Sequence, residues 1–99
     1  MIDVRPDHLD LIKQIFREHL SHCEIWAFGS RVKGKAKTYS DLDLVVVGHT
    51  KTPLKIMFQL KDEFAESELP FRVDLIDWNV ISEDFRGVIK QGYEVLCSL

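Results

Sequence analysis

An apolar strand that begins with two aspartates constrains this chain more than any other feature. Residues 40–47 read Ser-Asp-Leu-Asp-Leu-Val-Val-Val, a β-branched run that predicts a buried strand ended by Gly48. Side chains alternate along a strand, so Asp41 and Asp43 share one face, with Cα atoms roughly 6.5–7 Å apart. Two ionised carboxylates at that spacing repel each other, and a divalent cation removes the repulsion. The strand therefore predicts a metal site at its start.

The segments around this strand predict an α/β domain. The expected elements are a helix from Pro6 to about His22, a strand at 24–28, a helix from Thr52-Pro53 to about Leu69, a strand at 71–78, and a last helix that Ser82 caps and that includes Leu96. The basic loop 31–39 has room for one turn of helix. We expect a single domain over residues 1–99, with a small mixed three-stranded sheet flanked by helices.

Composition and charge exclude several classes of protein. Thirteen basic and sixteen acidic residues give a net charge of −3, a poor match for a protein that binds extended nucleic acid. The N-terminus lacks the pattern of a signal peptide, and no apolar run approaches the roughly 20 residues that span a membrane. Two cysteines do not form a disulfide framework. We therefore expect a cytoplasmic protein with no membrane partner.

A third carboxylate lies inside the next predicted strand. Asp74 stands between apolar neighbours and joins the first two carboxylates if the two strands are adjacent. Asp77 competes for this role, but it is three residues further on and faces the opposite side, so we interpret it as a solvated or capping residue. Three carboxylates can hold two metal ions roughly 3.5–4 Å apart, which suits an in-line displacement at phosphorus.

The segment Phe28-Gly29-Ser30-Arg31 predicts a phosphate site. A strand that ends in Gly29-Ser30 offers backbone amides and a hydroxyl donor to an anion. Arg31 and Lys33 begin a basic run that can neutralise triphosphate charge. Gly-Ser is also a common turn, and a basic loop is usually only solvated. The prediction therefore depends on the combination with the aspartates.

The spacing of these motifs resembles a known signature. Gly29-Ser30, ten residues, Asp41-Leu42-Asp43 and a later strand aspartate are similar to the DNA polymerase beta-like nucleotidyltransferases. The text of residues 29–34 and 40–44 especially resembles the minimal nucleotidyltransferases, short bacterial and archaeal proteins that are often paired, as antitoxins, with HEPN-domain toxins. Lys33 departs from the pattern, since many relatives carry a second arginine there, and it lacks the bidentate fork of arginine.

The resemblance implies a fold, a reaction and a set of site residues. It implies the polymerase beta-like nucleotidyltransferase fold and transfer of AMP from an NTP, with ATP as the usual donor, to a hydroxyl on a HEPN-domain partner. Gly29 and Ser30 would bind the β- and γ-phosphates. Asp41 and Asp43 would ligate two Mg²⁺ ions, with Mn²⁺ as an alternative. Asp74 would ligate the catalytic metal and help to deprotonate the acceptor hydroxyl.

Two alternatives remain open at this point. One is a transferase that acts on a small molecule such as an aminoglycoside, with the acceptor site supplied by another chain. The other is a non-catalytic antitoxin that acts by occlusion. The chain is short for a complete transferase, so we expect a homo- or hetero-oligomer in which a partner or second subunit completes the site.

Overall fold

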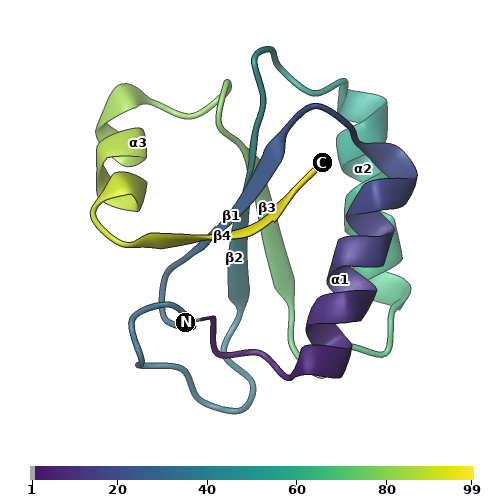
Figure 1. Ribbon diagram of the computed structural model, residues 1–99, viewed down its shortest axis with the longest axis vertical. Helices are drawn as coiled ribbons and strands as arrows, with labels where there is room; N and C mark the ends of the chain where they lie inside the picture. The colour runs from purple at the N-terminus through teal and green to yellow at the C-terminus, as the bar shows by residue number, and fades with distance from the viewer. Residues whose placement is uncertain (1) are drawn as a thin grey trace.

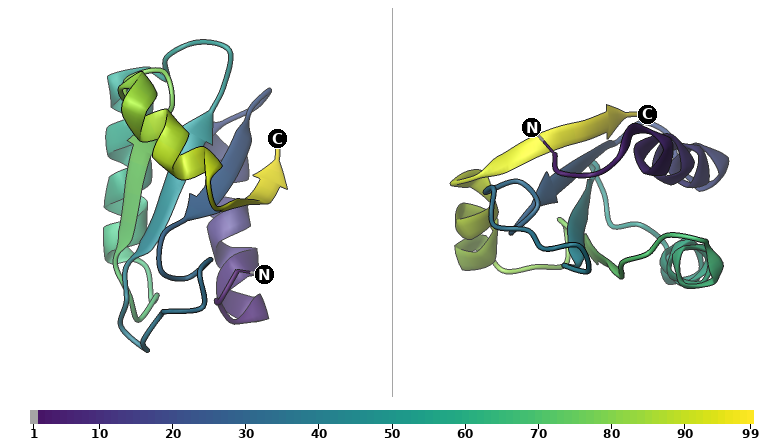
Figure 2. Two further views of the ribbon diagram at one scale, coloured as in Figure 1. Left: turned by 90° about the vertical axis from the view of Figure 1, so that its left-hand side faces the viewer. Right: turned by 90° about the horizontal axis from the view of Figure 1, so that it is seen from below.

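A computed structural model describes residues 2–99 and places two helices on one face of a four-stranded sheet and one helix on the other (Figures 1 and 2). The elements in chain order are α1 (Pro6–His19), β1 (Glu24–Phe28), β2 (Leu42–Val47), α2 (Leu54–Glu66), β3 (Val73–Asp77), α3 (Glu83–Lys90) and β4 (Tyr93–Ser98). Helices α1 and α2 lie side by side against one face, and α3 covers part of the opposite face.

The strand order of the sheet is β3-β2-β1-β4. Strand β1 is antiparallel to both β2 and β4, whereas β2 and β3 are parallel. The register places Asp74 beside Asp43, Asp43 beside Phe28, and Phe28 beside Tyr93. Residues directly opposite each other on neighbouring strands share a face of the sheet. A row of four side chains, two acidic and two aromatic, therefore crosses the face that α3 covers in part.

The fourth strand corrects the sequence-based prediction of three strands and a long last helix. Helix α3 ends at Lys90, and residues 93–98 form β4 against β1. Leu96 is therefore a buried core residue of a strand and not a helical contact. The segment is short and its exposure alternates, so only its pairing with the outer edge of β1 distinguishes it from helix.

The hydrophobic core lies between the sheet and the pair α1 and α2. Each helix contributes one apolar stripe, and the rings of Phe16 and Phe64 meet with centroids 5.2 Å apart. Burial of each such side chain stabilises the fold by about 1.5–3 kcal/mol. With the core on this face, the opposite face is free to hold polar groups. Among residues 2–99, no helix combines the length and the apolar character that a membrane crossing requires.

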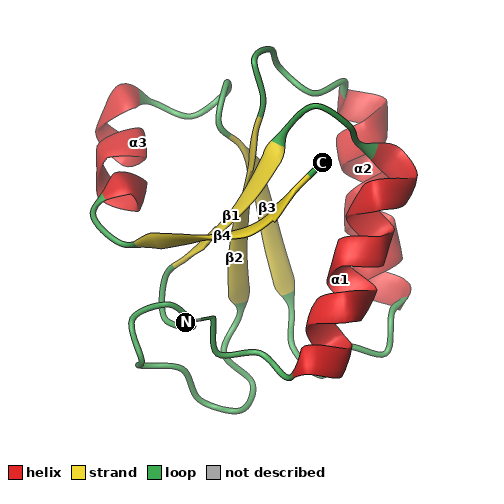
Figure 3. Ribbon diagram, viewed as in Figure 1, coloured by secondary structure: helices red, strands yellow, loops and turns green. Residues whose placement is uncertain are grey.

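The helix ends agree with the prediction in part. The hydroxyl of Ser82 accepts a hydrogen bond from the Phe85 N–H at 3.1 Å, which confirms the predicted cap of α3. Helix α2 begins after Pro53, which occupies the cap position in place of Thr52. Helix α1 ends at His19, three residues earlier than expected. The loop between β1 and β2 (green at the bottom of Figure 3) contains turns and no helix.

Candidate active site

Strand β1 ends in a glycine that lies directly against a carboxylate. Gly29 has a φ of +81°, and a β-carbon there would lie 2.3 Å from Oδ2 of Asp43. Only glycine accommodates both this backbone conformation and this contact. The carbonyl of Gly29 accepts hydrogen bonds from the Val32 and Lys33 amides, each at 3.1 Å, which closes a tight turn. The predicted Gly-Ser turn thus lies next to the predicted metal-binding carboxylate.

Two of the three predicted metal-binding aspartates lie on adjacent strands, and the third comes immediately before one of them. Asp43 is half-buried on β2 and stands in register with the exposed Asp74 on β3, while Asp41 is exposed immediately before β2. Burial, together with the neighbouring Asp74 and Asp41 carboxylates, raises the pKa of Asp43. Unpaired negative charge is therefore concentrated here. Carboxylate oxygens are the hard ligands that Mg²⁺ and Mn²⁺ prefer, so the donor set fits a divalent cation.

The three carboxylates are grouped but not tightly converged. The carboxylate oxygens of the three aspartates do not all lie within 4.8 Å of one another. Among residues 2–99, a group of possible metal ligands that close together is formed by Glu18, His19 and Glu63. That second group lies between α1 and α2, where His19 Nε2 and Glu63 Oε1 pair at 2.5 Å.

Arg31 is buried beneath the loop that leads into β2. Its guanidinium donates hydrogen bonds to four backbone carbonyls and stacks over Phe71 at 4.2 Å from the ring centroid. The side chain is 6% exposed, and the accepting carbonyls, with donor–acceptor distances of 2.8–3.4 Å, are those of Asp3, Lys37, Thr38 and Ser40. Arg31 therefore holds residues 37–40 in place immediately before Asp41.

These contacts revise the expectation that Arg31 binds the nucleotide. All of the bonds found for its guanidinium go to loop carbonyls and not toward the Gly29 turn. Sequence reasoning treats Arg31 and Lys33 as one basic run, and burial separates them. Lys33 is exposed and extends along the turn before β4, where a β-carbon at Gly92 would lie 3.6 Å from Lys33 Cε. Lys33 is thus free to reach an anion.

The Ser30 hydroxyl is available for a ligand. Ser30 is half-buried, and its carbonyl accepts a hydrogen bond from the Lys35 amide at 3.1 Å. Within the described part of the chain, no side-chain hydrogen bond occupies the Ser30 hydroxyl. Ser30 directly follows Gly29, whose α-carbon side lies against the Asp43 carboxylate.

Asp77 has a structural role on the other side of β3. Its carboxylate accepts hydrogen bonds from the Thr52 amide at 2.7 Å and the Asn79 amide at 2.9 Å. The residue is 6% exposed, so the interpretation as a capping residue is right and the interpretation as a solvated one is wrong. Asp77 ties the start of α2 to the end of β3. This leaves Asp74 as the carboxylate of β3 that faces Asp43.

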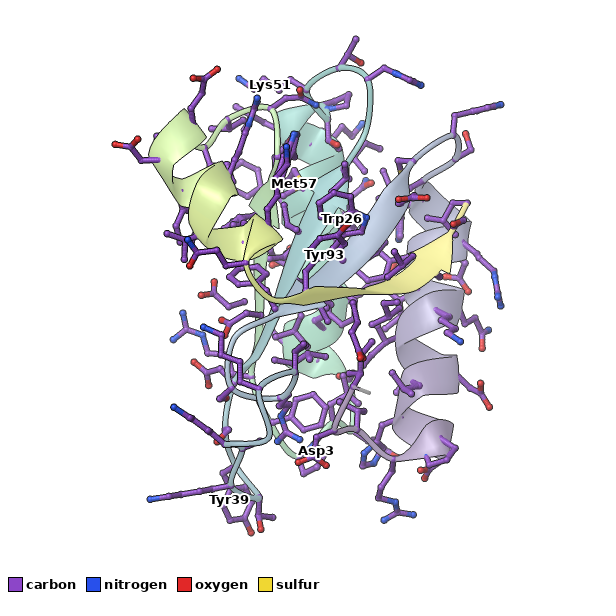
Figure 4. All side chains as sticks on the ribbon, turned by 60° about the vertical axis from the view of Figure 1, so that its left-hand side comes forward. Asp3, Trp26, Tyr39, Lys51, Met57 and Tyr93 are labelled. Atoms are coloured by element: carbon purple, nitrogen blue, oxygen red, sulfur yellow. The ribbon has the colours of Figure 1, made fainter. Side chains whose placement is uncertain are left out.

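An aromatic cluster lines the rest of the site face. Trp26 stacks on Tyr93 with centroids 4.1 Å apart, and it meets Trp78 edge-on at 5.2 Å (Figure 4). Phe28 contacts Phe85 of α3 at 6.0 Å. Sequence reasoning missed Tyr93 because it placed this segment in a helix. The aromatic floor and the acidic group share one face, which gives the site a hydrophobic side and a charged side.

Comparison with known proteins identifies the family. The family model described as "Polymerase beta, Nucleotidyltransferase" matches residues 10–98. A relative from Haemophilus influenzae, a probable protein adenylyltransferase MntA, is 45% identical over 95 residues, which are 96% of this chain and 83% of the relative. The protein adenylyltransferase MntA of Thermococcus cleftensis is 39% identical over 64 residues, 65% of this chain and 64% of that protein.

Solved structures share the fold. A crystal structure of a toxin–antitoxin complex with AMP-PNP contains a chain that aligns with a TM-score of 0.77 at 23% identity, covering 92% of this chain and 73% of that one. A tri-AMPylated HEPN toxin of Shewanella oneidensis in complex with its MNT antitoxin gives a TM-score of 0.70 at 23% identity, with coverages of 92% and 70%.

This chain belongs to the polymerase beta nucleotidyltransferase family. The expected polymerase beta-like α/β fold is confirmed, with four strands in the sheet instead of three. The resemblance to the minimal nucleotidyltransferases is confirmed as well, and the chain is a nucleotidyltransferase.

Proposed function

We propose that this chain is a protein adenylyltransferase that transfers AMP from ATP to a hydroxyl group of a HEPN-domain partner and so acts as its antitoxin. The observation that carries the proposal is the placement of Asp43 against both Gly29 and Asp74. A glycine turn that can bind phosphate and two in-register carboxylates suit phosphoryl transfer, which depends on positioning and charge stabilisation.

Each site residue has a role in the proposed reaction. The Gly29 turn and the Ser30 hydroxyl bind the β- and γ-phosphates, and the exposed Lys33 adds positive charge. The acceptor oxygen attacks the α-phosphorus, forming a new P–O bond, while the bond between the α-phosphorus and the bridging oxygen to the β-phosphate breaks. Pyrophosphate leaves with the electron pair. The Asp74 carboxylate accepts the proton of the acceptor hydroxyl.

Asp41, Asp43 and Asp74 would hold the divalent metal. Two Mg²⁺ ions, or Mn²⁺ in their place, would neutralise phosphate charge and lower the pKa of the acceptor hydroxyl. Burial and the two neighbouring carboxylates raise the pKa of Asp43, and a bound cation would offset that repulsion. Arg31 acts at one remove, by fixing the loop that positions Asp41.

The relatives support the choice of donor and acceptor. The Haemophilus influenzae relative is named a probable protein adenylyltransferase, one similar structure holds AMP-PNP, and another contains an AMPylated HEPN toxin. Each of these descriptions belongs to that protein. We extend them to this chain because its Gly-Ser turn and three aspartates are all present and grouped on one face of the sheet.

The decisive experiment measures transfer from α-³²P-labelled ATP, with Mg²⁺, to the protein encoded by the adjacent gene. We expect label on that protein with the wild-type chain and none with the Asp41→Asn/Asp43→Asn variant. A stable complex that carries no label with either chain would support occlusion instead. Label on an aminoglycoside and none on the adjacent protein would support the small-molecule transferase.

A further inference from the structure

An apolar groove follows the outer side of the sheet between α2 and the edge strand β3. The groove has a volume of about 210 Å³ and is lined mainly by apolar side chains, among them Leu54, Phe58, Ile76 and Val80. Three of these side chains are 59–61% exposed, namely Leu54, Phe58 and Val80. Exposed apolar side chains that gather in one groove mark an interaction site more often than scattered ones do.

The groove is continuous with the active-site edge of the sheet. A second cavity of about 470 Å³ shares Lys61 and Leu75 with it and extends to Asp74. Because β3 is an edge strand that pairs only with β2, its outer edge separates the groove from the face that carries Asp43. Ile76 lies two residues from Asp74, which is roughly 6.5–7 Å along the strand. A chain lying in the groove therefore reaches Asp74 by crossing one strand edge.

The rim of the groove is positively charged. Lys51 and Lys61 line it, and Lys55 is exposed on α2 between them. Among residues 2–99, no salt bridge neutralises any of these three lysines. Figure 4 shows Lys51 at the end of the molecule opposite Tyr39. The chain carries a net charge of −3, so this basic rim is a local departure from an acidic protein.

We propose that this groove, defined by Leu54, Phe58 and Val80 with its lysine rim, docks the protein that accepts AMP. The occupant is a partner segment with apolar side chains flanked by carboxylates, which matches the apolar floor and the basic rim. The proposal rests on the proposed protein adenylyltransferase function. Docking here holds the acceptor hydroxyl next to Asp74.

The test compares Phe58→Glu with Gln14→Glu. Both residues are exposed on helices of the same layer, but Gln14 lies on α1 and lines neither of the two cavities. The assay is transfer of AMP to the protein encoded by the adjacent gene, with binding of a fluorescent ATP analogue measured in parallel. We expect Phe58→Glu to raise the KM for the acceptor by about tenfold or more and to leave nucleotide binding unchanged. Gln14→Glu should match the wild type in both.

A charge reversal provides a second test. Lys55→Glu should slow association with the acceptor and reduce the salt dependence of the transfer rate, because rim charges mainly steer encounter. If Phe58→Glu and Lys55→Glu both transfer AMP as well as the wild type, the proposed docking surface is wrong and the proposed function stands. No transfer by the wild type would overturn the proposed function and the docking surface with it. A self-association of this chain that Phe58→Glu abolishes, with normal transfer, would assign the groove to a second copy.

Discussion

Gly29 and Asp43 approach so closely that a β-carbon on residue 29 would lie 2.3 Å from the Asp43 carboxylate. The turn that ends β1 and the carboxylate of β2 therefore share one small volume. Because the two strands are antiparallel and Phe28 pairs with Asp43, neither strand can slide along the other without breaking the register. The close approach joins the proposed phosphate site to the proposed metal site.

Gly29→Ala is expected to abolish transfer through this contact. The new methyl group displaces the Asp43 side chain, and the positive φ adds about 1–2 kcal/mol of strain. Gly34→Ala is the matched control, since Gly34 has a φ of +72° but no atom within 4 Å of an added β-carbon. Urea unfolding should show similar destabilisation for both variants, and only Gly29→Ala should lose activity. Equal loss of activity in both would show that strain, not displacement, matters.

Asp43→Asn is expected to stabilise the metal-free protein and to remove its response to metal. Burial and two neighbouring carboxylates raise the pKa of Asp43, so its ionised form is unfavourable in the folded state. An amide of the same shape relieves this repulsion. Thermal unfolding in EDTA should give a higher Tm than the wild type, and added Mg²⁺ should raise the Tm of the wild type alone.

Asp62→Asn controls for the loss of one negative charge in general. Asp62 is exposed on α2, away from the site face, and its replacement should leave both the Tm in EDTA and the Mg²⁺ response unchanged. A drop in Tm for Asp43→Asn in EDTA would show that the carboxylate has a stabilising partner. That result would remove the charge-repulsion argument for the metal site.

Asp74→Ala is expected to reduce AMP transfer, whereas Asp77→Ala is expected to reduce stability. Asp74 is exposed and faces Asp43, so its removal should change the free energy of unfolding by less than about 0.5 kcal/mol. The rate of AMP transfer by Asp74→Ala should fall by more than about 100-fold. Loss of a group that only supports a metal ligand typically costs roughly 10–100-fold. Asp77 is buried and accepts two amide hydrogen bonds, so Asp77→Ala should cost about 3 kcal/mol.

The same pair of variants distinguishes the two aspartates as metal ligands. Asp77→Ala should keep Mg²⁺-dependent nucleotide binding at a temperature where the variant is folded. If Asp77→Ala loses Mg²⁺-dependent nucleotide binding and keeps its stability, Asp77 and not Asp74 is the metal ligand of β3. Denaturant unfolding and nucleotide binding, measured on the same preparations, provide the comparison.

Arg31→Lys is expected to destabilise the protein by about 2–4 kcal/mol, since one ammonium cannot replace a planar group that reaches four carbonyls. Hydrogen exchange should accelerate in residues 37–40. Lys33→Met, at an exposed position, should change stability by less than about 0.5 kcal/mol and raise the KM for ATP. If Arg31→Lys raises the KM for ATP and leaves the stability unchanged, Arg31 binds the phosphates of ATP as the sequence predicts.

The local pattern of residues was sufficient to predict several parts of this protein. The aspartate pair on β2, the glycine turn after β1 and the Ser82 cap each follow from residue types at fixed spacing, because strand alternation and turn conformation act over two or three residues. The prediction of a metal site follows in turn, because two neighbouring carboxylates repel each other unless a cation lies between them. Burial of the α1 and α2 stripes follows from helical periodicity.

Long-range pairing decided the remainder. Strand β4 forms because the outer edge of β1 is open to it, and the six residues 93–98 are too few for a local pattern to distinguish strand from helix. The burial of Arg31 depends on carbonyls that come from residue 3 and from 37–40, and no spacing rule brings them together. The adjacency of β2 and β3 places Asp74 beside Asp43. These contacts join residues far apart in sequence, and only the packed chain fixes them.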